Sequence, residues 1–171
     1  MVHPNILPQS SRKTARSVSI DSLTEAVLRR YTDRIESKNI RIEKELQSLT
    51  AAVFPAFIDS AVCKLIENAI ESTPRGGELN VTLIDGEDCW ELEVADSAFE
   101  EIRSSNKGGS SLPDQVPEGV TTGSVDKRAR LEVIRRAATV HGGKIQTWDC
   151  PQGGTANVLV IPRRQEVNKA A

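Results

Sequence analysis

The sequence predicts an α+β fold: a two-layer α/β sandwich in which three helices cover one face of a mixed, mostly antiparallel sheet. Two observations predict it. Three segments carry apolar residues at helical spacing, and five others alternate apolar with polar residues, as half-buried strands do. Their order, α-β-α-β-β-loop-α-β-β, contains adjacent strand pairs and no repeat, which fits a single sheet with its helices on the same side.

The helices are predicted from apolar stripes and from their end signals. Ser22 and Glu25 have capping-box spacing at the start of the first helix. The third is followed by Gly142 and Gly143, a strong helix stop. The predicted helices are residues 22–39, 58–73 and 126–141.

The strands are predicted from period-two alternation. Asp85-Gly86 separates two of them and favours a hairpin. A long segment rich in Ser, Gly and Pro, residues 97–125, follows that hairpin, and loops of this length inside a domain are usually functional or disordered. The predicted strands are residues 40–46, 78–84, 89–94, 144–149 and 155–162.

Length and composition indicate one domain, residues 19–163, between a flexible N-terminal segment, 1–18, and a polar C-terminal tail, 164–171. The net charge of −2 argues against a nucleic-acid partner. No apolar run reaches the roughly 20 residues that a membrane span needs. Three widely spaced cysteines fit neither a disulfide framework nor a CxxC metal site, and they favour a cytoplasmic location.

Lys64, Asn68 and Glu71 share one edge of the second predicted helix, because they are spaced i, i+4, i+7. Asparagine is a mediocre helix former, so Asn68 invites a functional explanation. Its amide oxygen could coordinate a hard cation such as Mg²⁺. The simpler interpretation is a solvated helix face, and from the residues alone it is the favoured one.

Asp96 ends the strand "CWELEVADS", where the long segment begins. Loops at strand ends are favoured places for binding residues, and a carboxylate there could accept a hydrogen bond from a ligand's amino group. The competing interpretation is an N-cap for a short helix, residues 99–103.

Four stretches, taken together and in their order along the chain, resemble the ATP-binding catalytic domain of sensor histidine kinases. This domain belongs to the superfamily that includes DNA gyrase B and Hsp90-type chaperones. The resemblance covers residues 20–163 and implies the Bergerat-type ATP-binding fold. The motifs that carry it are "LIENAIESTPRGGELNVTL", "WELEVADS", "LEVIRRAATVHGGKI" and "PQGGTANVLVIP".

The resemblance implies ATP and Mg²⁺ as ligands and gives roles to matching residues. Asn68 corresponds to the Mg²⁺ ligand between the ATP phosphates, and Asp96 to the carboxylate that binds the adenine amino group. Thr155 matches a residue near that carboxylate. Residues 99–125 correspond to a nucleotide lid, and His141 to a structural residue rather than a phosphoacceptor.

The chain also departs from the family pattern at the phosphate end of the site. Ala98 replaces the glycine of Asp-x-Gly, and "DKRAR", residues 126–130, replaces a glycine-rich segment whose backbone N–H groups cradle phosphates. Lys127, Arg128 and Arg130 could compensate by contacting phosphate directly. Lys64 could contact a phosphate or pair with a neighbouring glutamate, but it cannot ligate Mg²⁺ while protonated.

Three functions therefore stay open. The first is an ATP/Mg²⁺-dependent kinase-like domain that acts by phosphotransfer in trans within a two-component-type pathway, with a partner that carries the phosphoacceptor histidine or a response regulator. The second is a degenerate, non-catalytic relative that serves as a protein-interaction or regulatory module. The third is a serine kinase of the anti-sigma-factor type.

Overall fold

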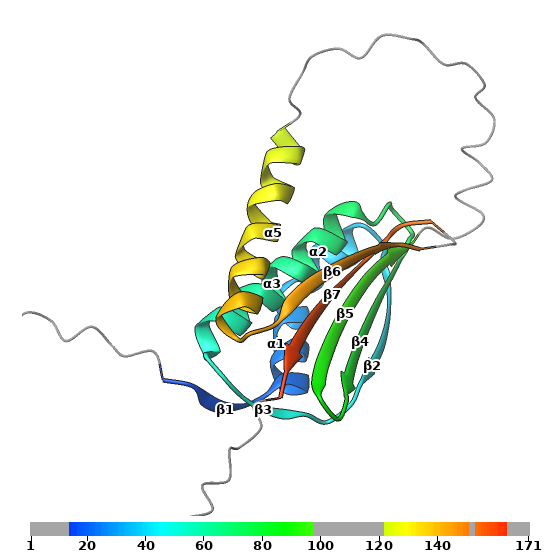
Figure 1. Cartoon of the computed structure of the whole chain (residues 1–171). Coiled ribbons are helices and arrows are strands. Elements are labelled where there is room, and N and C mark those ends of the chain that lie inside the picture. Colours follow the sequence, from blue (N-terminus) through cyan, green and yellow to red (C-terminus); the bar gives the residue numbers. More distant parts are fainter. Residues whose placement is uncertain (1–13, 98–121, 151–152, 164–171) are drawn as a thin grey trace, which may run out of the picture.

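The computed structural model describes residues 14–97, 122–150 and 153–163, which form a sheet layer and a helix layer (Figure 1). The sheet order is β2-β4-β5-β7-β6. β2 and β4 are parallel, and the other pairs are antiparallel, so the predicted mixed, mostly antiparallel sheet is confirmed. The strands are β2 (Arg41–Leu46), β4 (Glu78–Asp85), β5 (Cys89–Ser97), β6 (Lys144–Asp149) and β7 (Thr155–Pro162).

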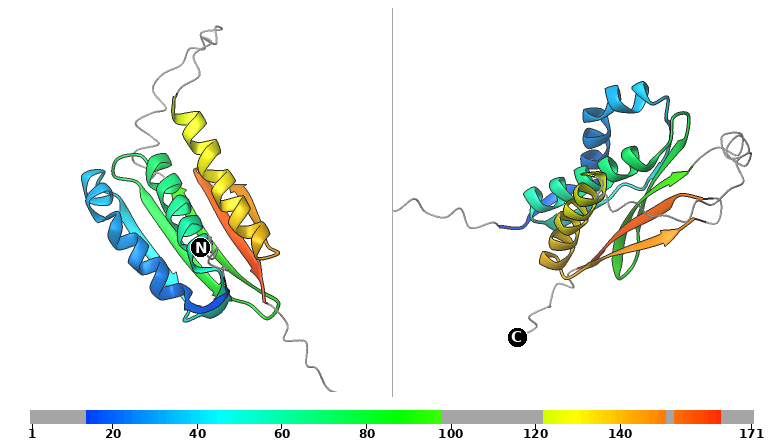
Figure 2. Two further views of the ribbon diagram at one scale, coloured as in Figure 1. Left: turned by 90° about the vertical axis from the view of Figure 1, so that its left-hand side faces the viewer. Right: turned by 90° about the horizontal axis from the view of Figure 1, so that it is seen from above.

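The three predicted helical segments lie on one face of this sheet (Figure 2). The first is two helices rather than one, and this corrects the prediction for residues 22–39. Tyr31 leaves helical geometry (φ −106°, ψ 9°), and the hydroxyl of Thr32 bonds the carbonyl of Arg29, which closes the turn between them. The helices are α1 (Ile20–Arg30), α2 (Thr32–Ser37), α3 (Pro55–Ser72) and α5 (Thr122–Val140).

The start of α5 also differs from the prediction. The helix begins at Thr122 and not at Asp126, so residues 122–125 are helical rather than part of the long loop. Gly123 and Val125 have low helix propensity, which explains why the sequence favoured a later start. The backbone N–H groups of residues 127–130 therefore lie inside the helix and are not at its free N-terminus. The predicted short helix 99–103 and most of the predicted lid lie outside the described residues.

A small second sheet was not predicted. β1 (Arg16–Ser19) pairs antiparallel with β3 (Thr50–Val53), so residues 16–18 are a strand and not part of a flexible segment as predicted. Strands of four residues are too short to show a clear alternation. The N–H of Ile20 continues this pairing with a bond to the carbonyl of Leu49 at 2.8 Å, which fixes the start of α1.

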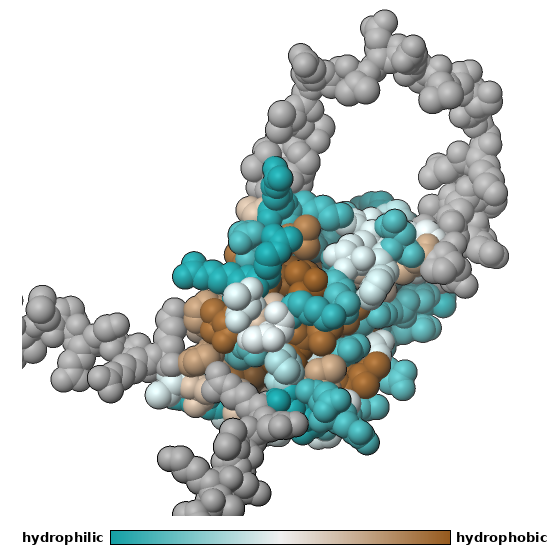
Figure 3. All heavy atoms as spheres, in the orientation of Figure 1, coloured by the Kyte–Doolittle hydropathy of each residue, from teal (hydrophilic) through white to brown (hydrophobic). Residues whose placement is uncertain are grey.

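The core lies between the sheet and the helices, as the alternating strands predicted. Trp90, Leu92 and Val94 of β5 are buried on the helix-facing side. Asp96 continues this alternation, so the strand carries its carboxylate to the same side, at the end of the sheet. On the face shown in Figure 3, hydrophilic side chains lie over the upper part of α5, and hydrophobic ones gather between this helix and the sheet. None of the described helices is long and apolar enough to cross a membrane.

His141 ties the end of α5 to the start of α3. The imidazole is buried, its Nδ1 lies 2.7 Å from the carbonyl of Ala137, and its Nε2 lies 2.9 Å from the N–H of Phe54. The carbonyl can only accept and the backbone N–H can only donate, so the ring is neutral with its proton on Nδ1. Both ring nitrogens are therefore occupied in holding the fold.

We predict that His141→Ala lowers the free energy of unfolding by about 2–3 kcal/mol, because it removes two buried hydrogen bonds and leaves a cavity. Thr139→Ala, at an exposed position two residues earlier, is the control and changes stability by less than about 0.5 kcal/mol. Urea denaturation of both variants measures the difference. Equal stabilities would contradict the structural role of His141.

Candidate functional site

Asn68 lies on α3 where that helix faces α5. The side chain is 2% exposed, because it flanks the apolar stripe that packs on the sheet. Its carboxamide oxygen, Oδ1, accepts a hydrogen bond from Nε of Arg130 at 2.5 Å. Asn68 is therefore not on a solvated helix face, and its oxygen is engaged by a cation from the neighbouring helix.

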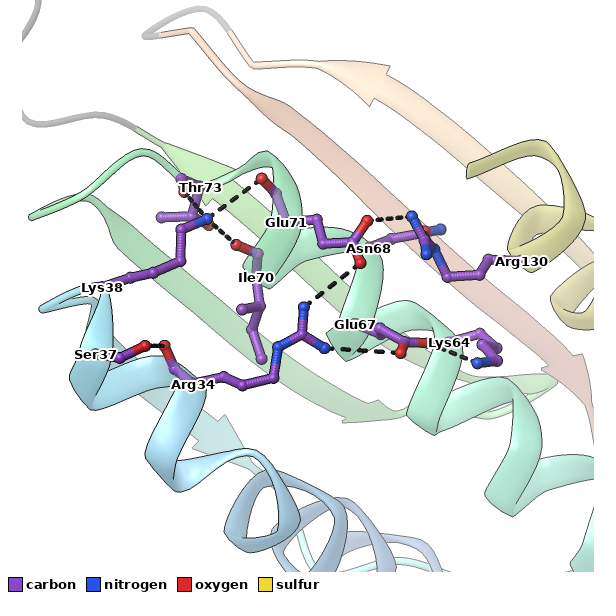
Figure 4. A network of polar contacts seen from close by, with 10 residues as sticks. All are labelled: Arg34, Ser37, Lys38, Lys64, Glu67, Asn68, Ile70, Glu71, Thr73 and Arg130. Atoms are coloured by element: carbon purple, nitrogen blue, oxygen red, sulfur yellow. Dashed lines mark hydrogen bonds and ion pairs between the residues drawn. The ribbon is translucent and has the colours of Figure 1, made fainter. Parts of the chain in front are cut away.

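Arg130 makes a second contact through the same guanidinium group. Its Nη2 pairs with a carboxylate oxygen of Glu71, one helical turn after Asn68 on α3. Glu71 also pairs with Arg34 of α2 at 3.4 Å. The side chain of Arg130 is only 12% exposed, whereas that of Glu71 is 39% exposed, so the ion pair lies at the edge of the buried region. Figure 4 shows how the network joins α2, α3 and α5.

Lys64 pairs with Glu67, not with the Asn68 oxygen. Its Nζ lies 2.6 Å from Glu67, which also lies 3.7 Å from Arg34. The hydrogen bond to Glu67 raises the pKa of Lys64, so its ammonium group stays protonated. A protonated amine has no lone pair for a metal and can only donate.

Lys38 closes the end of α3 in this region. Its Nζ donates to the carbonyls of Ile70 and Thr73 at 2.5 and 2.6 Å. These carbonyls lie at the end of the helix, where no following turn supplies an N–H for them. The network in Figure 4 therefore holds four cationic and two anionic side chains, and its formal charge is +2. The cations are Arg34, Lys38, Lys64 and Arg130, and the anions are Glu67 and Glu71.

The amide nitrogen of Asn68 has no hydrogen-bond partner among the described residues, although it is buried. The donated bond from Arg130 assigns the oxygen to that side, so the Nδ2 group is the unsatisfied one. A buried donor without an acceptor costs about 1–3 kcal/mol. Such a group is satisfied by a buried water or by a ligand atom that accepts a hydrogen bond.

Asp96 is 5% exposed and lies at the end of β5. One of its oxygens accepts the backbone N–H of Thr155 at 3.3 Å. Burial raises the pKa of Asp96, while the Thr155 N–H and the charge of Lys127 oppose this rise. No ion pair involving Asp96 occurs in the part of the chain that the structure describes. It is therefore a buried carboxylate with spare acceptor capacity.

Two glycines bring the start of β7 close to Asp96. Gly153 and Gly154 both have positive φ angles, 88° and 95°. A Cβ on Gly154 would lie 1.8 Å from the backbone oxygen of Asp96, so only glycine fits there. This explains the "GGT" motif: the glycines allow Thr155 to reach the carboxylate.

The basic residues at the start of α5 lie differently from one another. Lys127 and Arg128 are exposed on the helix, and Lys127 is near enough to act electrostatically on Asp96. Arg130, one helical turn away from Lys127, is turned toward α3. The predicted compensation by these three residues remains a prediction, and Arg130 is already engaged by protein groups.

The described residues suit a ligand amino group at Asp96 but do not suit Mg²⁺ at Asn68. A buried carboxylate with free acceptor capacity suits an amino group. Mg²⁺ binds oxygen at about 2.0–2.1 Å, so on Oδ1 of Asn68 it would lie within about 5 Å of the Arg130 guanidinium. Two unit charges 4 Å apart repel by about 4 kcal/mol at an effective dielectric constant near 20, and a divalent ion doubles this. Within the described ranges, no three His, Cys, Asp or Glu side chains cluster to hold a metal.

The sequence pointed to Asn68, Glu71 and Asp96, and to Thr155 near Asp96, but it did not predict that Arg130 contacts Asn68 and Glu71. The contact between Asn68 and Arg130 joins residues 62 positions apart, and spacing along the chain carries no signal for it. Arg34 was missed for the same reason. One signal was available in the sequence. Glu71 lies one helical turn from Asn68 on the edge that faces another helix, and a carboxylate in such a place predicts a compensating cation on the helix that packs against it.

No family model matches the chain. A curated relative, the adaptive-response sensory kinase SasA of Microcystis aeruginosa (strain NIES-843 / IAM M-2473), is 23% identical over 155 residues, which are 84% of this chain and 38% of SasA. The chain thus spans well under half the length of that relative.

Solved structures give a broader match. The nucleotide-free catalytic domain of histidine kinase ThkA is 21% identical, with a TM-score of 0.67 over 87% of this chain and 95% of that domain. The mycobacterial sensor histidine kinase MprB is 19% identical, with a TM-score of 0.63 over 86% and 97% of the two chains. ThkA has also been solved in complex with the response regulator TrrA; that ThkA chain is 22% identical, with a TM-score of 0.60 over 87% of this chain and 42% of ThkA. These comparisons confirm the predicted resemblance at the level of the fold: this chain has the fold of the histidine kinase catalytic domain.

Proposed function

We propose that this chain is a histidine-kinase-like domain that binds an adenine nucleotide and acts in trans on a protein partner in cytoplasmic, two-component-type signalling. The observation that supports it best is Asp96. A buried carboxylate that accepts one backbone N–H and is paired with no described cation costs stability, and perturbed ionisable groups of this kind concentrate at functional sites.

Asp96 also indicates the base. An ionised carboxylate can only accept hydrogen bonds, so it favours a base that presents an amino group beside its ring nitrogens. Adenine presents such a group at C6 and guanine presents one at C2, so Asp96 by itself does not distinguish the two bases. We propose adenine because the resemblance to the histidine kinase catalytic domain matches Asp96 to an adenine-binding carboxylate.

The partner is proposed to carry the phosphoacceptor histidine or to be a response regulator. His141 is buried with both ring nitrogens engaged, so it is a poor acceptor. ThkA, one of the proteins of this fold, forms a complex with a response regulator. Both observations support phosphotransfer or regulation between chains.

A second candidate is a non-catalytic regulatory module that binds a nucleotide without transferring phosphate. The contact of Arg130 with Asn68 favours it, because that contact occupies the oxygen implied to hold Mg²⁺. Both candidates share nucleotide binding, and a phosphotransfer assay with a separate phosphoacceptor domain distinguishes them.

We predict that calorimetric titration detects ADP and ATP binding, and that Asp96→Asn weakens it by about tenfold or more. Losing one hydrogen bond to a charged group costs about 1.5–3 kcal/mol, and 1.4 kcal/mol is about tenfold in affinity. Guanine nucleotides bind more weakly than adenine nucleotides to the unmodified chain.

The matched control is Asp88→Asn, at an exposed position in the β4–β5 hairpin, at the opposite end of β5. We expect Asp88→Asn to bind ADP and ATP with the same affinity as the unmodified chain. Binding that is absent from the unmodified chain, or that is the same in Asp96→Asn, would show that the chain does not use this site for nucleotides.

A further prediction concerns stability and pH in the absence of nucleotide. The folded-state pKa of Asp96 is raised above 3.8, so any stability it contributes is complete below about pH 4 and is lost as the pH rises through the folded pKa. Asn has no charge to bury and its amide oxygen can still accept the Thr155 N–H. The stability of Asp96→Asn relative to the unmodified chain therefore increases from pH 4 to pH 7 in urea denaturation. A difference that is constant with pH would contradict the burial of an ionised carboxylate.

A further inference from the structure

We infer that the nucleotide site proposed above binds phosphates without a divalent cation, because the guanidinium group of Arg130 supplies the positive charge at Asn68. The inference depends on the proposed nucleotide binding and names the form of the ligand: the metal-free polyphosphate rather than its Mg²⁺ complex. Three features of the described residues support it.

The first feature is how firmly Arg130 is held. Its Nε bonds Asn68 Oδ1 at 2.5 Å, and its Nη2 pairs with Glu71, so the planar guanidinium is fixed at two points on α3. These contacts use two of its five N–H groups within the described residues. The remaining N–H groups are donors that match phosphate oxygens, which Arg binds well.

The second feature is the orphaned amide nitrogen of Asn68. Because Arg130 takes the oxygen, the side chain has a buried donor left over. A donor is satisfied by a phosphate oxygen and repels a metal ion. Asn68 in this arrangement is therefore suited to bind the anion itself and not a cation bound to it.

The third feature is the charge of the network that surrounds the two residues. Lys38 donates only to backbone carbonyls at the end of α3, and the side chains joined to Arg130 by ion pairs comprise, with it, three cations and two anions, a formal charge of +1. Such a region attracts a polyphosphate and repels Mg²⁺. Binding Mg²⁺ to the nucleotide cancels part of the phosphate charge, so it weakens this attraction instead of strengthening it.

The test is a set of calorimetric titrations with ADP and ATP, in EDTA and in MgCl₂, on the unmodified chain and on Arg130→Gln. The unmodified chain binds at least as tightly in EDTA as in MgCl₂. Arg130→Gln keeps the length and a donor but removes the charge, so it binds about tenfold more weakly in EDTA. MgCl₂ then restores part of its affinity, because the Asn68 oxygen is no longer held beside a cation.

Arg135→Gln is the matched control: it removes an exposed arginine on the same helix, whose partner is Glu132. It leaves both the affinity and its independence of Mg²⁺ unchanged. Arg130→Lys is the second variant if Arg130→Gln does not fold: it keeps the charge and binds in EDTA, and a requirement for MgCl₂ in this variant would contradict the inference.

Two results would overturn the inference, and they differ in what they mean for the proposed function. Binding by the unmodified chain that requires Mg²⁺ would leave nucleotide binding established and exclude the role given to Arg130. An absence of binding in both buffers, for every folded variant, would remove the proposed function and the inference together.

Discussion

The structure around the candidate site depends on one constraint: polar side chains buried between a sheet and its helices must find partners. Asn68 and Asp96 are both buried there, at 2% and 5% exposure. Leaving a buried polar group unpaired costs about as much as a hydrogen bond contributes, so each one dictates what lies beside it. Asn68 accepts a hydrogen bond from Arg130 of α5, and Asp96 accepts one from the N–H of Thr155 of β7.

The hydrogen-bond partners of these two residues differ in charge, so the candidate site has two halves, one at Asp96 and one at Asn68. At the Asp96 half, the partner is a neutral backbone group, and two positive-φ glycines bring it close. At the Asn68 half, the partner is the charged side chain of Arg130, which also pairs with Glu71 on the same helix as Asn68. The two halves therefore differ in character: Asp96 keeps a free hydrogen-bond acceptor, and the side chains around Asn68 carry excess positive charge.

The sequence predicted the Asp96 half better than the Asn68 half, for a physical reason. Strand alternation through Trp90, Leu92 and Val94 extends to Asp96, so its side of the sheet followed from local pattern alone. The engagement of Asn68 depends on how α3 and α5 pack, which brings together residues far apart in sequence. Local pattern also failed at the ends of elements, where α5 begins four residues before Asp126 and where β1 and β3 are too short to show a period.

The charge on Asp96 is the strongest remaining argument for a ligand. A purely structural residue at this position needs only one oxygen to accept the Thr155 N–H, and an asparagine would provide it without burying a charge. The aspartate instead costs stability in the folded protein, since burial raises its pKa. Natural sequences retain such costs where activity requires them. The burial of this carboxylate is therefore the observation on which the proposed ligand depends most.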